Sequence, residues 1–140
     1  MREDEIQEQI DKFHYWDMRV KTLECNNFSD EVKLVYDDSD GYEVVYHFIG
    51  CYRVVFEHVK NYDKLRSVKN MTIPQIPYFL QEVNVTSVIE ENRQFYVSKM
   101  NIFPLYTEIW SKEINIMRNR QAGNRLTETG SAASSTITNT

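Results

Sequence analysis

Short runs of β-branched and aromatic residues, separated by polar turns, fill most of the chain from Met18 to Met117. Valine, isoleucine, tyrosine and phenylalanine favour strands because their side chains pack well on a pleated surface. Seven such runs are long enough to be strands: Met18–Cys25, Glu31–Asp37, Tyr42–Gly50, Tyr52–Val59, Glu82–Glu90, Arg93–Asn101 and Leu105–Met117. Most linkers between them are short, and short linkers join antiparallel strands. The pattern predicts a mainly-β fold of about seven antiparallel strands, arranged as a β-sandwich or a partly open barrel.

The N-terminal segment from Glu3 to Phe13 has a different period. Ile6, Ile10 and Phe13 recur at the spacing of one helical face. Acidic residues concentrate in the first turn, where they complement the positive end of the helix dipole. This segment is predicted to form a short amphipathic helix, which gives the mainly-β fold a minor α component.

Two other segments lack a strand pattern. Pro74 and Pro77 interrupt the stretch after Asn61, and proline cannot donate to a central sheet ladder, so we expect a connection with one helical turn at Pro77–Gln81. Residues 118–140 contain few large apolar groups, so they cannot bury enough surface to offset the entropy of ordering. We expect residues 1–117 to form a single β-rich domain and residues 118–140 to form a disordered C-terminal tail.

Charge and cysteine content exclude several classes of protein. The formal net charge is −5, whereas proteins that bind nucleic acid non-specifically usually carry a basic surface. No apolar run approaches the roughly 18 residues that a membrane span needs, and the charged N-terminus is unlike a signal peptide. Cys25 and Cys51 are too few for a disulfide framework, and we expect both to be buried thiols. The composition predicts a cytoplasmic protein without nucleic-acid or membrane partners.

Histidines are the first candidates for a catalytic or metal site. His47 and His58 lie in neighbouring predicted strands, but no short spacing fixes a third ligand near them, so we expect no metal. The chain has no G-x-S-x-G nucleophile elbow and no glycine-rich phosphate loop, so we expect no cofactor and no catalytic activity. An enzyme that uses His14 and Asp17 stays open as an alternative, provided that their side chains converge in a cleft.

The segment Phe13–Val20, FHYWDMRV, marks the change from helical to strand periodicity. An aspartate at such a junction can accept hydrogen bonds from backbone amides that neither element pairs. We therefore predict a structural role for Trp16 and Asp17, with the rings of Phe13 and Trp16 packed beneath the corner. His14 is expected to face solvent.

The last predicted strand carries apolar residues on both faces. Trp110, Ile114 and Ile116 share one parity. Leu105 and Ile109 fall on the other. Either a bulge within the strand or burial of both faces would explain this pattern.

Acidic residues gather at two predicted turns, and tyrosines line the strands beside them. Tyrosine is enriched in protein interfaces, and negative charge accelerates the encounter with a basic partner. We therefore expect a non-catalytic protein-binding module, with a basic domain as the leading partner. The candidate binding residues are Asp37, Asp38, Asp40, Tyr42, Glu90 and Glu91.

A small-molecule carrier is an alternative, in which the sheet curves around an apolar pocket as in lipocalin-like barrels. Such a carrier needs an enclosed cavity of roughly several hundred cubic ångströms. His47 or a tyrosine would point into it.

Three segments carry a family resemblance: WDMRV at residues 16–20, the predicted strand at residues 41–49, and NIFPLYTEIW at residues 101–110. Together with the order of elements over residues 13–117, they resemble small bacterial immunity-type proteins encoded beside polymorphic or contact-dependent toxins. That group often has His-Asp where this chain has Trp16-Asp17. The resemblance implies a compact antiparallel β-rich fold without catalytic activity, and a protein that neutralises a cognate toxin by binding it.

Overall fold

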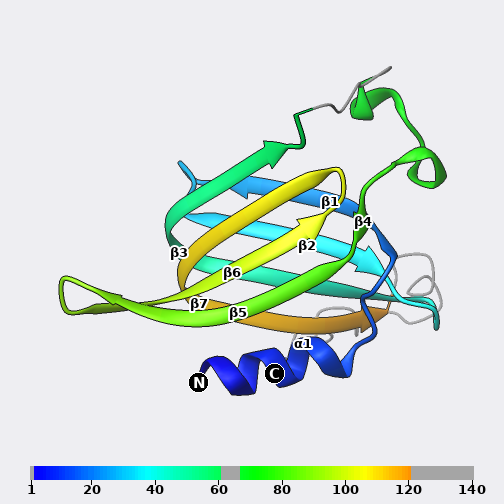
Figure 1. Cartoon of the computed structure of the whole chain (residues 1–140). Helices are drawn as coiled ribbons and strands as arrows, with labels where there is room; N and C mark the ends of the chain where they lie inside the picture. Colours follow the sequence, from blue (N-terminus) through cyan, green and yellow to red (C-terminus); the bar gives the residue numbers. More distant parts are fainter. Residues whose placement is uncertain (1, 61–66, 121–140) are drawn as a thin grey trace.

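The computed structural model describes residues 2–60 and 67–120, which are mainly β-strands (Figure 1). One helix, α1 (Glu3–Lys12), precedes the strands, and two 3₁₀ helices, η1 (Val68–Asn70) and η2 (Ile73–Gln75), follow β3. The strands are β1 (Met18–Asn26), β2 (Glu31–Asp37), β3 (Tyr42–His58), β4 (Phe79–Leu80), β5 (Glu82–Glu90), β6 (Arg93–Ile102) and β7 (Leu105–Arg120). The prediction of a mainly-β fold with a short N-terminal helix is confirmed.

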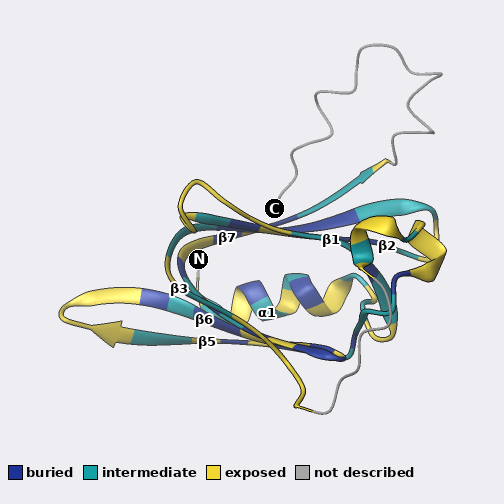
Figure 2. Cartoon of the chain, turned by 90° about the horizontal axis from the view of Figure 1, so that it is seen from above, coloured by how far each residue is buried: buried dark blue, intermediate teal, exposed yellow. Residues whose placement is uncertain are grey.

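The strands form one antiparallel sheet with the order β4-β1-β2-β3-β7-β6-β5. It bends so strongly that the β5–β6 arm faces the β1–β2 arm, and the β5–β6 hairpin projects beyond the body (Figures 1 and 2). The Phe79 N–H donates to the Phe103 carbonyl at 3.2 Å, and the Gln81 N–H donates to the Asn101 carbonyl at 2.8 Å. These bonds draw the two sides together without closing the sheet, as in the predicted partly open barrel.

β3 is one strand of 17 residues, which corrects the separate strands predicted at Tyr42–Gly50 and Tyr52–Val59. Gly50 has a φ of 68°, and the register with β7 shifts between Cys51 and Arg53. A β-bulge of this kind bends a strand and lets pairing continue on both sides. The glycine therefore marks a bend in β3 and not a turn between two strands.

The connection after β3 contains a strand that the sequence did not predict. Phe79 and Leu80 form β4 and pair with Arg19 and Met18 of β1, which corrects the helical turn predicted at Pro77–Gln81. A short strand is possible here because the prolines precede it and leave its own N–H groups free to pair. β4 replaces the strand lost by joining the two halves of β3, so the predicted number of strands is right.

Replacing Gly50 with alanine is expected to lower the free energy of unfolding by about 1–2 kcal/mol. The new side chain would sit at a positive φ, and its Cβ would lie 3.3 Å from the Lys112 Cβ. Gly41→Ala is the matched control, because Gly41 also has a positive φ but no atom lies within 4 Å of an added Cβ. Urea denaturation should show a smaller loss for Gly41→Ala; equal losses would contradict a role for the Lys112 contact.

α1 lies along the open side of the bent sheet, where it adjoins β5 and β7 (Figure 2). Ile6 and Ile10, which form its apolar face, are almost completely buried. The barrel interior beneath the helix is filled by Val20, Val32, Leu34, Tyr36, Val44, Tyr46, Phe48, Leu80, Val83, Met100, Ile102, Ile109 and Ile116. Burial of this apolar surface is the main force that holds the helix and the two arms of the sheet together.

Gln7 fastens α1 to the edge of the sheet. Its side-chain amide donates to the Val83 carbonyl at 3.0 Å and accepts from the Val85 N–H at 2.8 Å. Both groups belong to β5, an edge strand whose outward backbone groups would otherwise be unpaired. Gln7 thus takes the place of a neighbouring strand at these two residues.

Gln7→Ala is expected to lower the free energy of unfolding by about 1–2 kcal/mol, because it leaves two partly buried backbone groups without partners. Glu8→Ala is the control, since Glu8 lies on the exposed face of the same helix. Urea denaturation of both variants checks the prediction. A Gln7→Ala loss no larger than that of Glu8→Ala would show that water replaces the amide at no cost.

β7 extends to Arg120, so residues 118–120 belong to the sheet and not to the predicted tail. Composition does not predict a strand here because these three residues are polar or charged. One of them, Arg118, has a specific partner that is described below. Residues 121–140, the rest of the predicted tail, lie outside the described residues. Cys25 is exposed because it lies near the end of β1, which corrects its predicted burial, whereas Cys51 is half-buried.

Candidate binding surface

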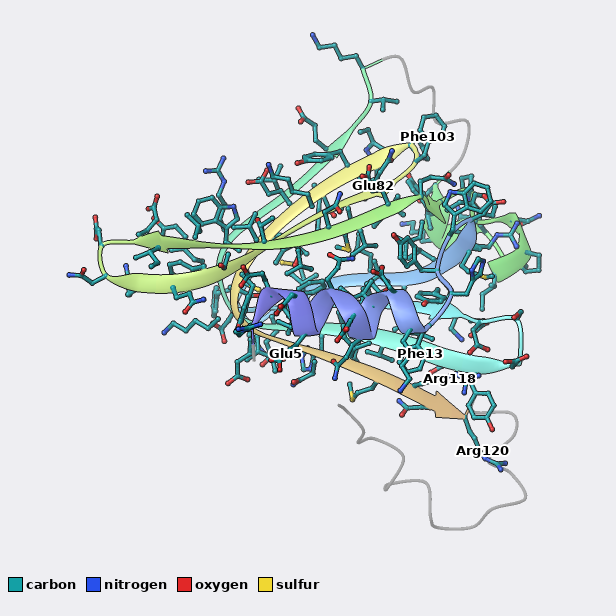
Figure 3. All side chains as sticks on the ribbon, turned by 60° about the horizontal axis from the view of Figure 1, so that its bottom comes forward. Glu5, Phe13, Glu82, Phe103, Arg118 and Arg120 are labelled. Carbon is teal, nitrogen blue, oxygen red and sulfur yellow. The ribbon has the colours of Figure 1, made fainter. Side chains whose placement is uncertain are left out.

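The predicted acidic turn between β2 and β3 is largely neutralised within the protein. Asp38 accepts hydrogen bonds from the backbone N–H groups of Asp40 and Tyr42, and from Arg118 Nε at 2.7 Å. The Arg118 guanidinium also lies 4.2 Å from the ring centre of Tyr42 and 5.9 Å from that of Phe13. Figure 3 shows Arg118 beside Phe13 at the end of α1. These contacts hold β7, the turn and the end of the helix together. We call the bonds between Arg118 and Asp38 the clamp.

Asp37 is also paired internally. Lys21 Nζ lies 2.8 Å from the Asp37 carboxylate and 2.7 Å from that of Glu43. Of the three aspartates predicted at this turn, Asp40 is the exposed one, with 74% of its side chain accessible. Its distance to Arg118 is 3.3 Å, compared with 2.7 Å for Asp38. The turn therefore offers a partner less negative charge than its sequence indicates.

Glu90 and Glu91, the other predicted acidic residues, lie at the tip of the β5–β6 hairpin, where both are exposed. Glu91 and Asn92 have φ values of 51° and 66°, as a two-residue hairpin turn requires. This tip and the β2–β3 turn lie at opposite ends of the molecule (Figure 1). The structure does not bring the six predicted binding residues into one surface.

The corner between α1 and β1 is held by Asp17, although not by the contacts predicted. The Asp17 carboxylate accepts from the Gln81 side-chain amide at 3.2 Å, and the Asp17 N–H donates to the Leu80 carbonyl. His14 is exposed, as expected. Because the Asp17 carboxylate bonds Gln81, the geometry lends no support to a His14–Asp17 catalytic pair.

Trp16 does not pack beneath this corner, which corrects the prediction. Its side chain is 59% exposed. Phe13 packs against the core as predicted, and Tyr15 takes the place that was predicted for Trp16. Asp17, with a φ of 65°, turns the chain immediately after Trp16, so the indole is left on the outside.

The remaining histidines lie in separate places. His47 Nε2 lies 2.8 Å from the Glu31 carboxylate on β2. His58 Nε2 lies 2.7 Å from the Tyr78 hydroxyl, at an apolar pocket of about 200 Å³ between β1, the connection and the start of β7. This pocket is smaller than the carrier alternative requires, and the barrel interior is filled by the core.

A group of aromatic residues lies on the outer face of the sheet, where β3 bends. The bulge places both Tyr52 and Arg53 beside Trp110 of β7. The Tyr52 ring stacks on Phe95 with ring centres 4.9 Å apart, and the Arg53 guanidinium lies 5.8 Å from the Trp110 ring centre. Phe95 is buried, whereas Tyr52 is 55% exposed. We call Tyr52, Arg53, Phe95 and Trp110 the aromatic patch.

Trp110 is fixed in position by a hydrogen bond. Its indole N–H donates to the Glu108 carboxylate at 2.8 Å, and the Tyr106 hydroxyl donates to the same carboxylate at 3.1 Å. The bond from Trp110 holds the pKa of Glu108 below its ordinary value, so Glu108 stays ionised at neutral pH. Because the patch is ordered in advance, a partner that binds it loses less conformational entropy.

The β1–β2 turn lies next to the patch, since the Cys51 N–H donates to the Asp30 carbonyl at 2.9 Å. Asn27, Phe28 and Ser29 all have positive φ values, and the Phe28 side chain is fully exposed. A left-handed backbone costs a non-glycine residue about 1–3 kcal/mol, and such strain clusters at functional sites. The turn next to the patch therefore exposes a second large apolar side chain, that of Phe28.

Sequence reasoning missed this surface, although two signals for it exist. Phe28 is a large apolar residue within the polar turn NNFSD. In β7, residues 105, 107, 109 and 111 are buried, then Lys112 and Glu113 are both exposed, then Ile114 and Ile116 are buried. The buried side of the strand therefore changes at residues 112–113, which is the kind of irregularity that the sequence pattern predicted. As a result Trp110 lies on the outer face.

Comparisons with known proteins identify the family. Within residues 2–60 and 67–120, no helix is long and apolar enough to cross a membrane. Comparison with curated proteins gave no match. The family described as immunity protein PIM7 matches residues 2–118, which contain α1, the strands up to the last residues of β7, and the aromatic patch. The match confirms the immunity-type resemblance and indicates a protein toxin as the kind of partner. Because it covers most of the chain, this protein belongs to the immunity protein family PIM7.

Proposed function

We propose that this protein neutralises a cognate toxin by binding it directly through the aromatic patch, without catalysing a reaction. The observation that carries the proposal is the placement of the exposed Tyr52 and the half-buried Trp110 beside Arg53 on the outer face. Tryptophan, tyrosine and arginine are the residues that most often dominate the binding energy of protein interfaces. Membership of an immunity family supports a toxin as the partner.

The shape of the surface supports the same proposal. Tyr52 and part of Trp110 present apolar area on the outside of the barrel, away from the core that fills its interior, and the exposed Phe28 lies in the turn next to the patch. Contiguous exposed apolar area on a folded protein is typical of an interaction site. A toxin seated there would have part of its own surface covered, which blocks it sterically. On this proposal the protein acts in the cytoplasm of the cell that it protects.

The experiment is co-expression of this protein with the toxin encoded by the neighbouring gene, together with titration calorimetry of the purified pair. We expect the host to grow only when the immunity protein is present, and the two proteins to bind with one-to-one stoichiometry. Protection without measurable binding would contradict direct neutralisation. Binding without protection would show that the patch does not cover the toxin's functional surface.

A further inference from the structure

We infer that Arg53 binds a carboxylate side chain of the toxin, so the toxin face that covers the aromatic patch is locally acidic. The inference rests on the proposed function, because it names the partner chemistry at the same patch. It differs from the basic partner expected from the sequence, for which Asp37 and Asp38 were candidate contacts. Those two carboxylates are already paired with Lys21 and Arg118.

Arg53 is free to receive a ligand. Its side chain is exposed, and no carboxylate among residues 2–60 and 67–120 lies within ion-pair distance of it. The guanidinium stacks on Trp110, and stacking uses the face of the group while its N–H donors at the edge remain available. A carboxylate matches that planar fork with two parallel hydrogen bonds.

Glu108 is the neighbouring carboxylate on which the charge of Arg53 acts, but it accepts its hydrogen bonds from Trp110 and Tyr106 and not from Arg53. Glu108 lies opposite Lys99 in the β6–β7 ladder. Glu90 lies opposite Arg93 in the β5–β6 ladder. Arg53 instead lies opposite an uncharged residue. Because charges are screened beyond about 8 Å at physiological ionic strength, a contact at Arg53 depends on its own guanidinium and its near neighbours more than on the net negative charge of the chain.

The test compares binding of the neighbouring-gene toxin to the wild type, Arg53→Gln, Arg53→Lys and Lys69→Gln. Lys69→Gln is the matched control, because it removes one positive charge at an exposed site in η1, outside the patch. We expect Arg53→Gln to raise the Kd about tenfold, Arg53→Lys to raise it less, and Lys69→Gln to leave it unchanged. A thermal melt confirms that each variant is folded.

A second arm identifies the carboxylate. Each exposed Asp or Glu of the toxin is replaced by its amide, and double-mutant cycles are measured with Arg53→Gln and, as the control, with Lys69→Gln. One toxin position should show coupling to Arg53 and none to Lys69.

The outcomes separate the inference from the proposed function. If the wild type does not bind the toxin, the proposed function fails and the inference fails with it. If the wild type binds and Arg53→Gln binds equally well or more tightly, the inference alone is overturned. If Arg53→Gln does not weaken binding but Asp40→Asn, Glu90→Gln or Glu91→Gln does, the toxin face is basic and not acidic.

Discussion

Replacing Trp110 with alanine is expected to weaken toxin binding at least about 30-fold, the effect of losing an interface hot spot. Trp110 contacts Tyr52, Phe95 and Arg53, so its removal leaves the other members of the patch without a shared neighbour. The loss should appear mainly as faster dissociation, because short-range packing governs the lifetime of a complex more than its encounter rate. Surface plasmon resonance with the immobilised neighbouring-gene toxin measures both rates.

Trp16 provides a matched control for this prediction, since the chain has two tryptophans and both indoles reach the surface. The corner that holds Trp16 and the bend of β3 lie at opposite ends of the molecule (Figure 1). Trp16→Ala should therefore bind the toxin like the wild type. In that variant Trp110 is the sole tryptophan, so a change in its fluorescence on binding reports directly on the patch. Equal weakening by both substitutions would exclude the patch as the specific contact.

Most of the fold could be predicted because hydrophobic periodicity is a local signal. Strands β1, β2, β5 and β6 each correspond to a run rich in β-branched or aromatic residues between polar turns, and such a run can be recognised on its own. The break predicted at Gly50 is wrong because a glycine with positive φ serves a hairpin turn and a bulge equally well, and only the pairing with β7 distinguishes them. β4 could not be predicted because two residues are too few to show a hydrophobic pattern. It is a strand only because it pairs with β1 and bonds the β6–β7 turn, both of which are distant in the sequence.

The candidate site was harder to predict, since exposure and charge pairing depend on contacts far apart in the sequence. Asp38 looks like a free acidic residue until Arg118, 80 positions later, is seen to donate to it. Trp110 shares its parity with buried residues of the same strand, and only the irregularity at residues 112–113 places it outside. Tyr52 and Phe95 become one surface only through the order of strands β3, β7 and β6.

Replacing Asp38 with alanine is expected to lower the free energy of unfolding by about 3 kcal/mol. This is the largest effect on stability that we expect from a substitution in the acidic turn. The substitution leaves the Arg118 Nε–H and two backbone N–H groups without their acceptor at a site where the Asp38 side chain is 9% exposed. Asp40→Ala is the matched control: Asp40 contacts the same Arg118 but is 74% exposed, so its loss should cost less than about 1 kcal/mol. Urea denaturation at pH 7 compares them; similar losses would mean that the clamp has no role.

The same clamp predicts how stability depends on pH. Burial alone would raise the pKa of Asp38, but the bonds from the Tyr42 N–H and from Arg118 outweigh it and hold that pKa below its ordinary value of 3.8. A carboxyl whose pKa is lower in the folded state stabilises fully above the unfolded value, and this contribution disappears as the pH falls below it. The stability difference between the wild type and Asp38→Asn should therefore be constant above about pH 5 and shrink below about pH 4. Unfolding curves from pH 7 to pH 3 measure that difference, and one that stays constant to pH 3 would show that the charge on Asp38 does not hold the turn to β7.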